Sequence, residues 1–295
     1  MPLPSIVPTI HHFGPKHPER RIAVAAGAEG HLVRFEQRMP LAQALQEALR
    51  ARGASSGFAE LFGIRLASVR YVHPSIGDTV RRAVSFSTAK RQDAVELVQA
   101  SAVIGSRFGE DFTHCHAMWR DGDGMLHGGH LLADTLMEPG SGFAIVHPLF
   151  GAELVSDDDP ETLMPTFTPH ASDPARSGTE ALVPTIIARV LPNEDLTEAA
   201  IALTREAGFA RAVVRAGTGS LIGADFAPVG GGRRRIVDGP ATEVISVNGV
   251  VDAAAETASL TATLVDRQGQ LHAGVLTAAA NPAAVTFELV LQEIR

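Results

Sequence analysis

The sequence predicts an α/β fold of the α+β type, in which a unit of one helix followed by several strands occurs twice. Two segments carry apolar residues at the spacing of an amphipathic helix, Leu41–Arg52 and Leu196–Ala207. Gly-Phe-Ala follows each of them, at 57–59 and at 208–210, and β-rich sequence comes next. Because self-similarity of this kind marks a repeated architecture, we expect two tandem domains, each a mostly antiparallel sheet with one or two helices.

Changes in composition along the chain predict the domain boundaries. Residues 1–19 are expected to form an N-terminal arm, of the kind that often packs on a neighbouring subunit, and residues 20–155 the first domain. Residues 156–181 are rich in Asp, Pro, Ser and Thr, which is typical of a linker. Residues 182–295 then form the second domain. The alternative is that residues 156–181 form a lid over a functional site, but nothing in the composition of this segment favours a lid.

The length, net charge and cysteine content of the chain limit the kinds of protein that it can be. A chain of 295 residues suits two ordinary domains or one large domain. The formal charge of −8 opposes binding to nucleic acid, which needs many Lys and Arg side chains, so we expect nucleic acid to be an unlikely partner. One cysteine, Cys115, excludes an intrachain disulfide and fits a reducing cytoplasm. No secretory signal and no apolar run of membrane-spanning length is recognisable, so we expect a cytoplasmic protein without membrane contact.

The segment Phe112–Leu131 is predicted to be a strand, a tight turn and a second strand. Side chains two apart on a strand point the same way, so His114 and His116 share a face. The turn sequence Asp121-Gly-Asp-Gly124 brings His130 back beside them. Three imidazoles that converge in this way are typical of a metal site with three protein ligands and an open position. The alternative is a histidine-rich hairpin that faces solvent or a subunit contact.

Two neighbouring residues are expected to have other roles. Cys115 lies between two of the candidate ligands on the strand, so it should point to the opposite face as a small buried hydrophobic residue. His127 has a counterpart in the second half, His272, and is expected to make a hydrogen bond at a strand end.

Alignment of the two halves, with one gap in the turn, places apolar residues opposite each candidate ligand. The aligned pairs are His114 with Leu260, His116 with Ala262, and His130 with Val275. Because all three histidines are replaced together, we interpret them as one functional unit. The second copy would then serve as scaffold for a metal that the first copy holds.

The pattern of His-x-His, a Gly/Asp turn and Gly-Gly-His-Leu resembles the plants-and-prokaryotes-conserved (PPC) domain, a family of small α/β domains. The resemblance covers roughly residues 20–155, and the second half also resembles a PPC domain. The histidines of the family pattern fall on His114, His116 and His130. The fold is similar to that of α-acetolactate decarboxylase, which holds zinc on an equivalent set. The resemblance therefore implies Zn²⁺ or another divalent transition metal at the triad, and a homo-oligomer, with a trimer favoured. The alternative is a fold in which the two copies of the chain complete one another.

Two functions follow from the resemblance. The first is a metal-dependent lyase or decarboxylase that acts on a small oxygenated, anionic carboxylate, whose oxygens the metal would polarise. Glu60, Arg65, Arg70 and Glu138 are candidates for its proton donor and anion anchor, although the family pattern assigns none of them. The alternative is a PPC-type DNA-binding or regulatory, small-molecule-sensing protein without catalysis.

Two glycine-rich segments are interpreted as a strand-to-strand turn and as a surface loop, respectively. Gly217-Thr-Gly-Ser220 lacks the spacing of a dinucleotide-binding loop. Gly230-Gly-Gly-Arg-Arg-Arg235 is a flexible basic loop that lacks the alternating Arg-Gly-Arg-Pro core of the AT-hook found beside plant PPC domains.

Overall fold

The computed structural model describes residues 7–78, 81–173 and 182–294. Over these residues the chain is mostly β-sheet, with only two α-helices, α1 (Leu41–Arg50) and α2 (Leu196–Glu206). The expected helices therefore exist and begin where the sequence predicts. The expected α/β class is confirmed only in part, because the mostly antiparallel sheet and the helices are present but long strands dominate both halves.

The first half of the chain, residues 21–171, holds twelve strands. They are β1 (Arg21–Ala28), β2 (His31–Val33), β3 (Gly57–Val72), β4 (Pro74–Ile76), β5 (Val84–Phe86), β6 (Lys90–Arg107), β7 (Glu110–Arg120), β8 (Leu126–Leu131), β9 (Leu136–Met137), β10 (Phe143–Phe150), β11 (Ala152–Asp158) and β12 (Pro165–Ala171). The second half, residues 183–293, holds eight. They are β13 (Val183–Val190), β14 (Arg211–Leu221), β15 (Ala224–Phe226), β16 (Arg235–Val237), β17 (Thr242–Asp252), β18 (Thr257–Val265), β19 (Leu271–Val275) and β20 (Ala283–Glu293).

Sixteen of these strands belong to one continuous network of pairings, in the order β12-β11-β6-β7-β8-β3-β10-β1-β13-β20-β14-β17-β18-β19, with β2 and β9 beside it. The network closes on itself in the first half, because β3 pairs with both β6 and β8. Strand β1 joins the halves, since it pairs with β10 on one side and with β13 on the other. In the β1–β13 pair Arg21 lies opposite Val190 and Ala28 opposite Val183, so the first residue of each strand meets the last of the other.

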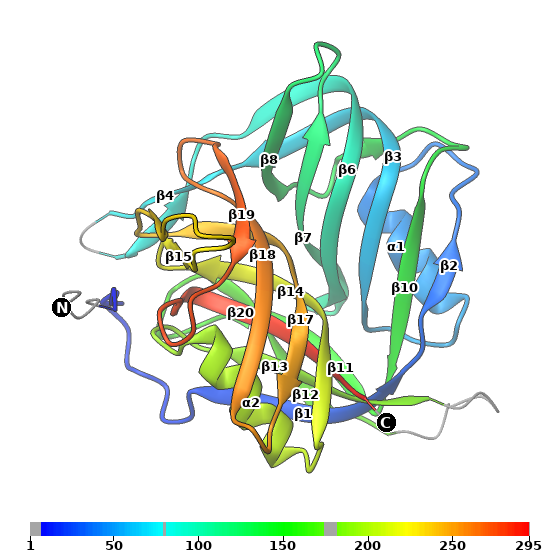
Figure 1. The fold of residues 1–295 in the computed structure, drawn as a ribbon. Coiled ribbons are helices and arrows are strands. Elements are labelled where there is room, and N and C mark those ends of the chain that lie inside the picture. The colour runs from blue at the N-terminus through cyan, green and yellow to red at the C-terminus, as the bar shows by residue number, and fades with distance from the viewer. Residues whose placement is uncertain (1–6, 79–80, 174–181, 295) are drawn as a thin grey trace.

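Each helix covers the outer face of the sheet in its own half (Figure 1). In α2, Asp195 is the N-cap and its carboxylate accepts hydrogen bonds from the backbone N–H groups of Thr197 and Glu198, which stabilises the first turn. In α1 the apolar face buries Leu45 and Leu49 completely. Both helices thus leave the inner faces of the sheets free to pack on each other.

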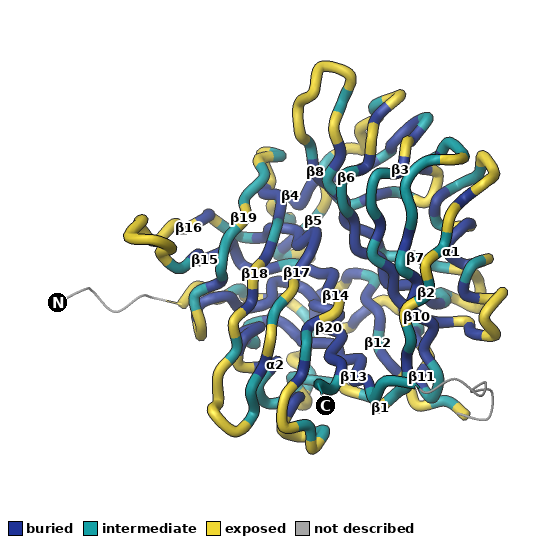
Figure 2. Tube along the Cα trace, turned by 45° about the vertical axis from the view of Figure 1, so that its right-hand side comes forward, coloured by how far each residue is buried: buried dark blue, intermediate teal, exposed yellow. Residues whose placement is uncertain are grey.

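The inner faces of the two halves meet in a buried apolar layer, which includes Phe58, Val103, Ile187 and Val290. Figure 2 shows buried backbone running through the middle of the molecule, where the two halves are in contact. Gly128 permits a close approach there, because a Cβ at this position would lie 2.7 Å from Leu271 Cδ2. The histidine strands β7 and β8 therefore lie directly against the second half.

The described part of the expected arm packs on the second half, whereas the segment expected as a linker adds a strand to the sheet of the first half. Within the described part of the arm, the His12 Nε2–H donates to the carbonyl of Ala284 at 2.7 Å, and the Ile10 N–H donates to Asn193 Oδ1 at 2.8 Å. Within the segment expected as a linker, β12 pairs with β11, while residues 174–181 lie outside the described residues. The described part of the chain contains no helix long and apolar enough to cross a membrane.

Candidate metal centre

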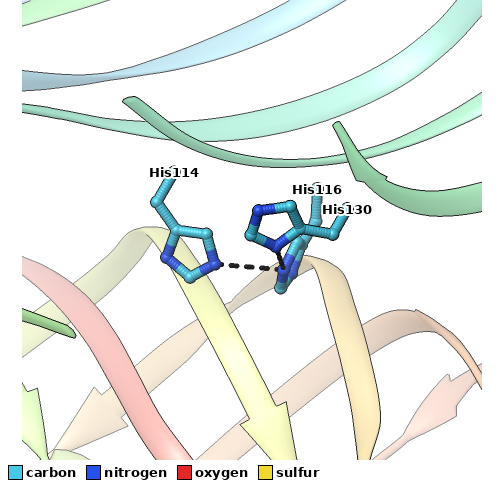
Figure 3. Close-up of side chains that lie close together, drawn as sticks. All are labelled: His114, His116 and His130. Carbon is cyan, nitrogen blue, oxygen red and sulfur yellow. Dashed lines mark hydrogen bonds between the residues drawn. The ribbon is translucent and has the colours of Figure 1, made fainter. Parts of the chain in front are cut away.

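The side chains of His114, His116 and His130 converge on one point (Figure 3). The Nε2 atoms of His114 and His116 are 3.1 Å apart, and His116 Nε2 lies 3.2 Å from His130 Nδ1. One ring nitrogen from each histidine lies within 4.8 Å of the other two. The arrangement arises because His114 and His116 alternate along β7 and His116 is directly opposite His130 in the β7–β8 pair. The three histidines are thus close enough to hold a metal ion, as the sequence predicts.

The second half of the chain orients two of these rings. The His114 Nδ1–H donates to Glu288 Oε2 on β20 at 3.0 Å, and the His116 Nδ1–H donates to the carbonyl of Val244 on β17 at 2.9 Å. These hydrogen bonds leave the Nε2 lone pair of each ring directed at the shared point. Partners of this kind fix the tautomer and orientation of metal-binding histidines.

Replacement of Glu288 by glutamine is expected to weaken metal binding by about 10- to 100-fold, because an amide accepts a weaker hydrogen bond from His114 than a carboxylate does. Competition with a chromophoric chelator measures the affinity. Replacement of the exposed Glu256 by glutamine is the control and should change nothing. Equal affinity of the Glu288 variant and the unaltered protein would contradict this role.

The environment keeps two of the rings, His116 and His130, neutral. Burial, followed by the nearby His114, lowers the pKa of His130 to about 3. Burial also lowers the pKa of His116 well below its usual value, and the neighbouring His114 and His130 add to the effect. Because only neutral imidazole can bind a metal ion, these two ligands are not lost to protonation in the neutral range.

A buried carboxylate lies beside the triad. Glu243 on β17 is 3% exposed, and its Oε1 lies 3.7 Å from His116 Nε2 and 3.8 Å from His130 Nδ1. Its other oxygen, Oε2, has no hydrogen-bond partner among the described residues. Burial raises the pKa of this carboxyl group well above its usual value, against a smaller opposing effect of the His130 backbone.

The triad and Glu243 form the polar end of a small cavity of about 100 Å³. The remaining walls are mostly apolar, and are Pro74, Val84, Phe86, Phe112, Met164, Pro165, Phe167, Gly219, Ser220, Ala241, Val285 and Thr286. Both halves contribute to this list, so the cavity exists only where they meet.

None of the four candidate acid and anion-anchor residues is among the residues that line this cavity. Glu60 lies 3.8 Å from the ring of the buried His147, and Arg70 forms an exposed ion pair of 2.5 Å with Asp134. Arg65 and Glu138 line a separate open groove. The structure therefore does not bring these four side chains together at the triad.

The turns that follow β7 and β18 are built alike. In the first, Asp121 accepts from the His127 ring at 2.7 Å, and in the second Asp266 accepts from the His272 ring at 2.9 Å. The hydrogen bond expected for His127 is thus present. The two turns also share a backbone hydrogen bond. The Asp121 N–H donates to the carbonyl of Met125 in the first turn, and the Asp266 N–H donates to the carbonyl of Gln270 in the second.

Because these turns have equal length, the alignment of the halves needs no gap. The pair of His116 with His130 corresponds to the pair of Thr261 with Val275. The predicted alignment of His116 with Ala262, and of His114 with Leu260, is therefore wrong by one residue. Ser259 and Thr261 occupy those positions, so the second half still lacks the triad.

The Cys115 thiol is directed away from the triad, as predicted, and packs in the apolar core between α1 and the sheet. Burial raises its pKa to about 12. At pH 8 the thiolate fraction should be roughly a thousandfold lower than in the unfolded chain. A disulfide reagent that releases a coloured thiol should therefore react with the denatured protein and hardly at all with the native one. Rapid reaction of the native protein would contradict this placement.

Sequence reasoning missed Glu243 and Glu288. Each is the only charged residue within an apolar stretch, Thr242–Val247 and Ala283–Leu291 respectively. A lone carboxylate in a buried strand is uncommon unless it has a partner, and this was the available signal.

Comparison with known proteins gives a family match in the second half of the chain. Residues 178–295 match the family model of the Plants and Prokaryotes Conserved (PCC) domain, the family also abbreviated PPC. No curated protein matches the chain. A decarboxylase relationship and a tandem arrangement of two such domains are not confirmed by this match.

Solved structures share part of the fold with this chain. A "Putative DNA-binding protein" from Ralstonia eutropha JMP134 is 20% identical, with a TM-score of 0.35 over 47% of this chain and 88% of that one. A metal-containing protein from Archaeoglobus fulgidus is 16% identical, with a TM-score of 0.37 over 54% and 98%. A plant- and prokaryote-conserved (PPC) protein from Pyrococcus horikoshii is 14% identical, with a TM-score of 0.34 over 47% and 89%.

Two functional expectations need correction. The metal-dependent decarboxylase is wrong, because the PCC match favours the alternative without catalysis. The expectation that nucleic acid is an unlikely partner is also wrong, because it conflicts with the name of the Ralstonia eutropha structure. Net charge describes the whole surface and does not exclude a local basic segment.

Proposed function

We propose that this chain is a non-catalytic regulatory protein of the PPC type, in which a metal ion at the triad helps to bind a small molecule in the adjacent cavity. The observation that carries the proposal is the cavity itself, where three histidine nitrogens and a buried carboxylate meet an apolar wall. Cavities with a few convergent polar groups and mostly apolar walls are typical of small-molecule sites.

Zinc is the metal that the donor set favours. Three neutral imidazoles with one further position suit the tetrahedral preference of Zn²⁺. The nitrogen separations of 3.1 and 3.2 Å agree with the spacing of about 3.4 Å between ligand atoms around a tetrahedral zinc with bonds of about 2.1 Å.

The two halves are proposed to be tandem PPC-type domains. Each half has a strand, a helix and then a set of antiparallel strands in the same order, and each contains the same Asp-His turn. In this arrangement the first domain supplies the metal ligands, and the second supplies the hydrogen-bond acceptors that orient them.

Elemental analysis of the purified chain tests the metal proposal. We expect about one zinc ion per chain after dialysis against zinc. A thermal-shift screen of small molecules, with and without zinc, then tests the cavity, since a ligand of this site should stabilise the metal-bound form more. A protein that takes up no metal would contradict the proposal.

DNA binding is a second candidate function, and the loop Gly230–Arg235 favours it. All of this loop is exposed. The side chain of Arg234 binds Asp225, and that of Arg235 binds the carbonyl of Ala273. A mobility-shift titration with duplex DNA at several salt concentrations is the test, since phosphate contacts weaken as salt rises. Replacement of Arg233 by serine should weaken any binding, and unchanged migration of the DNA at low salt would reject this function.

A further inference from the structure

We infer that Glu243 is a fourth ligand of the metal ion, so that the ion joins the two halves of the chain. This inference rests on the proposed metal site and adds to it a ligand from outside the histidine strands. The triad belongs to β7 and β8, whereas Glu243 belongs to β17 of the second half.

The position of the carboxylate supports this role. Glu243 Oε1 approaches the same two atoms that face the shared point, His116 Nε2 at 3.7 Å and His130 Nδ1 at 3.8 Å. Ligand atoms around a tetrahedral zinc are about 3.4 Å apart. Oε1 therefore needs to move by only a few tenths of an ångström to complete the spacing to both nitrogens.

The burial of Glu243 points to a partner that the protein atoms do not supply. Its side chain is 3% exposed and Oε2 has no hydrogen-bond partner among the described residues. Arginine and lysine are absent from the lining of the cavity. A carboxylate that is buried without a cation is costly, and a metal ion is the compensating charge that this site can accept.

The first half offers a direct comparison. Glu96 on β6 lies opposite Arg120, just before a bulge between Leu97 and Gln99. Glu243 lies opposite Val265, just before the corresponding bulge between Val244 and Ser246. Glu96 is exposed, whereas Glu243 is buried against the triad. The equivalent position therefore carries a solvated carboxylate in the first half and a carboxylate that faces the metal site in the second half.

Zinc affinity of the full-length chain provides the test. Metal-free protein is titrated with Zn²⁺ in competition with a chromophoric chelator, for the unaltered chain, Glu243→Gln and the matched control Glu96→Gln. We expect Glu243→Gln to weaken zinc binding by at least about 10-fold and Glu96→Gln to leave it unchanged. The Co²⁺-loaded forms provide a second readout, because loss of a carboxylate ligand should shift the visible absorption band in Glu243→Gln only.

Folding and metal binding are separated by a third measurement. Glu243→Gln keeps the shape of the side chain and removes a buried acid, so circular dichroism of the metal-free variant should match that of the unaltered chain. Zinc should also raise the melting temperature of the unaltered chain more than that of the variant.

Equal zinc affinity and equal Co²⁺ spectra for Glu243→Gln and the unaltered chain would overturn the inference while the histidine site stands. Failure of the unaltered chain to bind zinc at all would overturn both the inference and the proposed metal site.

Discussion

Replacement of His130 by alanine is expected to abolish stoichiometric metal binding and to leave the fold intact. The variant removes one of the three converging nitrogens and leaves two imidazoles on β7 with the inferred ligand Glu243, which is one ligand short of the four that hold a tetrahedral zinc ion. The His130 side chain is 18% exposed, so its loss leaves no large cavity in the core. Elemental analysis measures the metal, and circular dichroism measures the fold.

His127 provides the control for this prediction. It lies on the same strand, but its ring binds Asp121 and has no part in the triad. His127→Ala should therefore retain about one zinc ion per chain. Undiminished zinc in His130→Ala would count decisively against the triad as the metal site.

The second large effect concerns stability. Replacement of Arg189 by methionine is expected to lower the free energy of unfolding by about 3–5 kcal/mol, because it leaves a buried carboxylate without its partner. Arg189 on β13 and Asp159, in the loop between β11 and β12, are 2.7 Å apart, with side chains 5% and 1% exposed. Urea unfolding followed by circular dichroism gives the free energy.

An exposed ion pair between α2 and the turn that joins β17 to β18 is the control. Arg205 and Glu256 are also 2.7 Å apart, but their side chains are 55% and 70% exposed. Arg205→Met should cost less than about 1 kcal/mol, since solvent screens such pairs. If both variants lost the same free energy of unfolding, burial would not be the reason for the large contribution of the Arg189–Asp159 pair.

The histidine triad could be predicted because it depends on local geometry. Alternation along β7 and a short turn into β8 are enough to bring His114, His116 and His130 together. Glu243 and Glu288 could not be placed in the same way. They lie more than 100 residues further along the chain, and only the packing of one half on the other brings them to the site.

The fold, like the site, could be predicted from the sequence only in part. Helical periodicity gave the first residues of α1 and α2, Leu41 and Leu196, and placed their ends within two residues. The dominance of sheet was underestimated, because the length of β3 and β6 follows from their mutual pairing over most of their length. The alignment of the turn after β18 with the turn after β7 was wrong by one residue. A gap was assumed there, although both turns have the same backbone hydrogen bonds.

Strands β1 and β13 come before the helix of their own half, and each meets the other in reversed, symmetric register. Two equivalent strands that pair in antiparallel register form a two-fold symmetric contact. The same kind of contact can form between identical strands of two separate molecules. In this chain β1 and β13 belong to one polypeptide, so their pairing does not depend on the protein concentration.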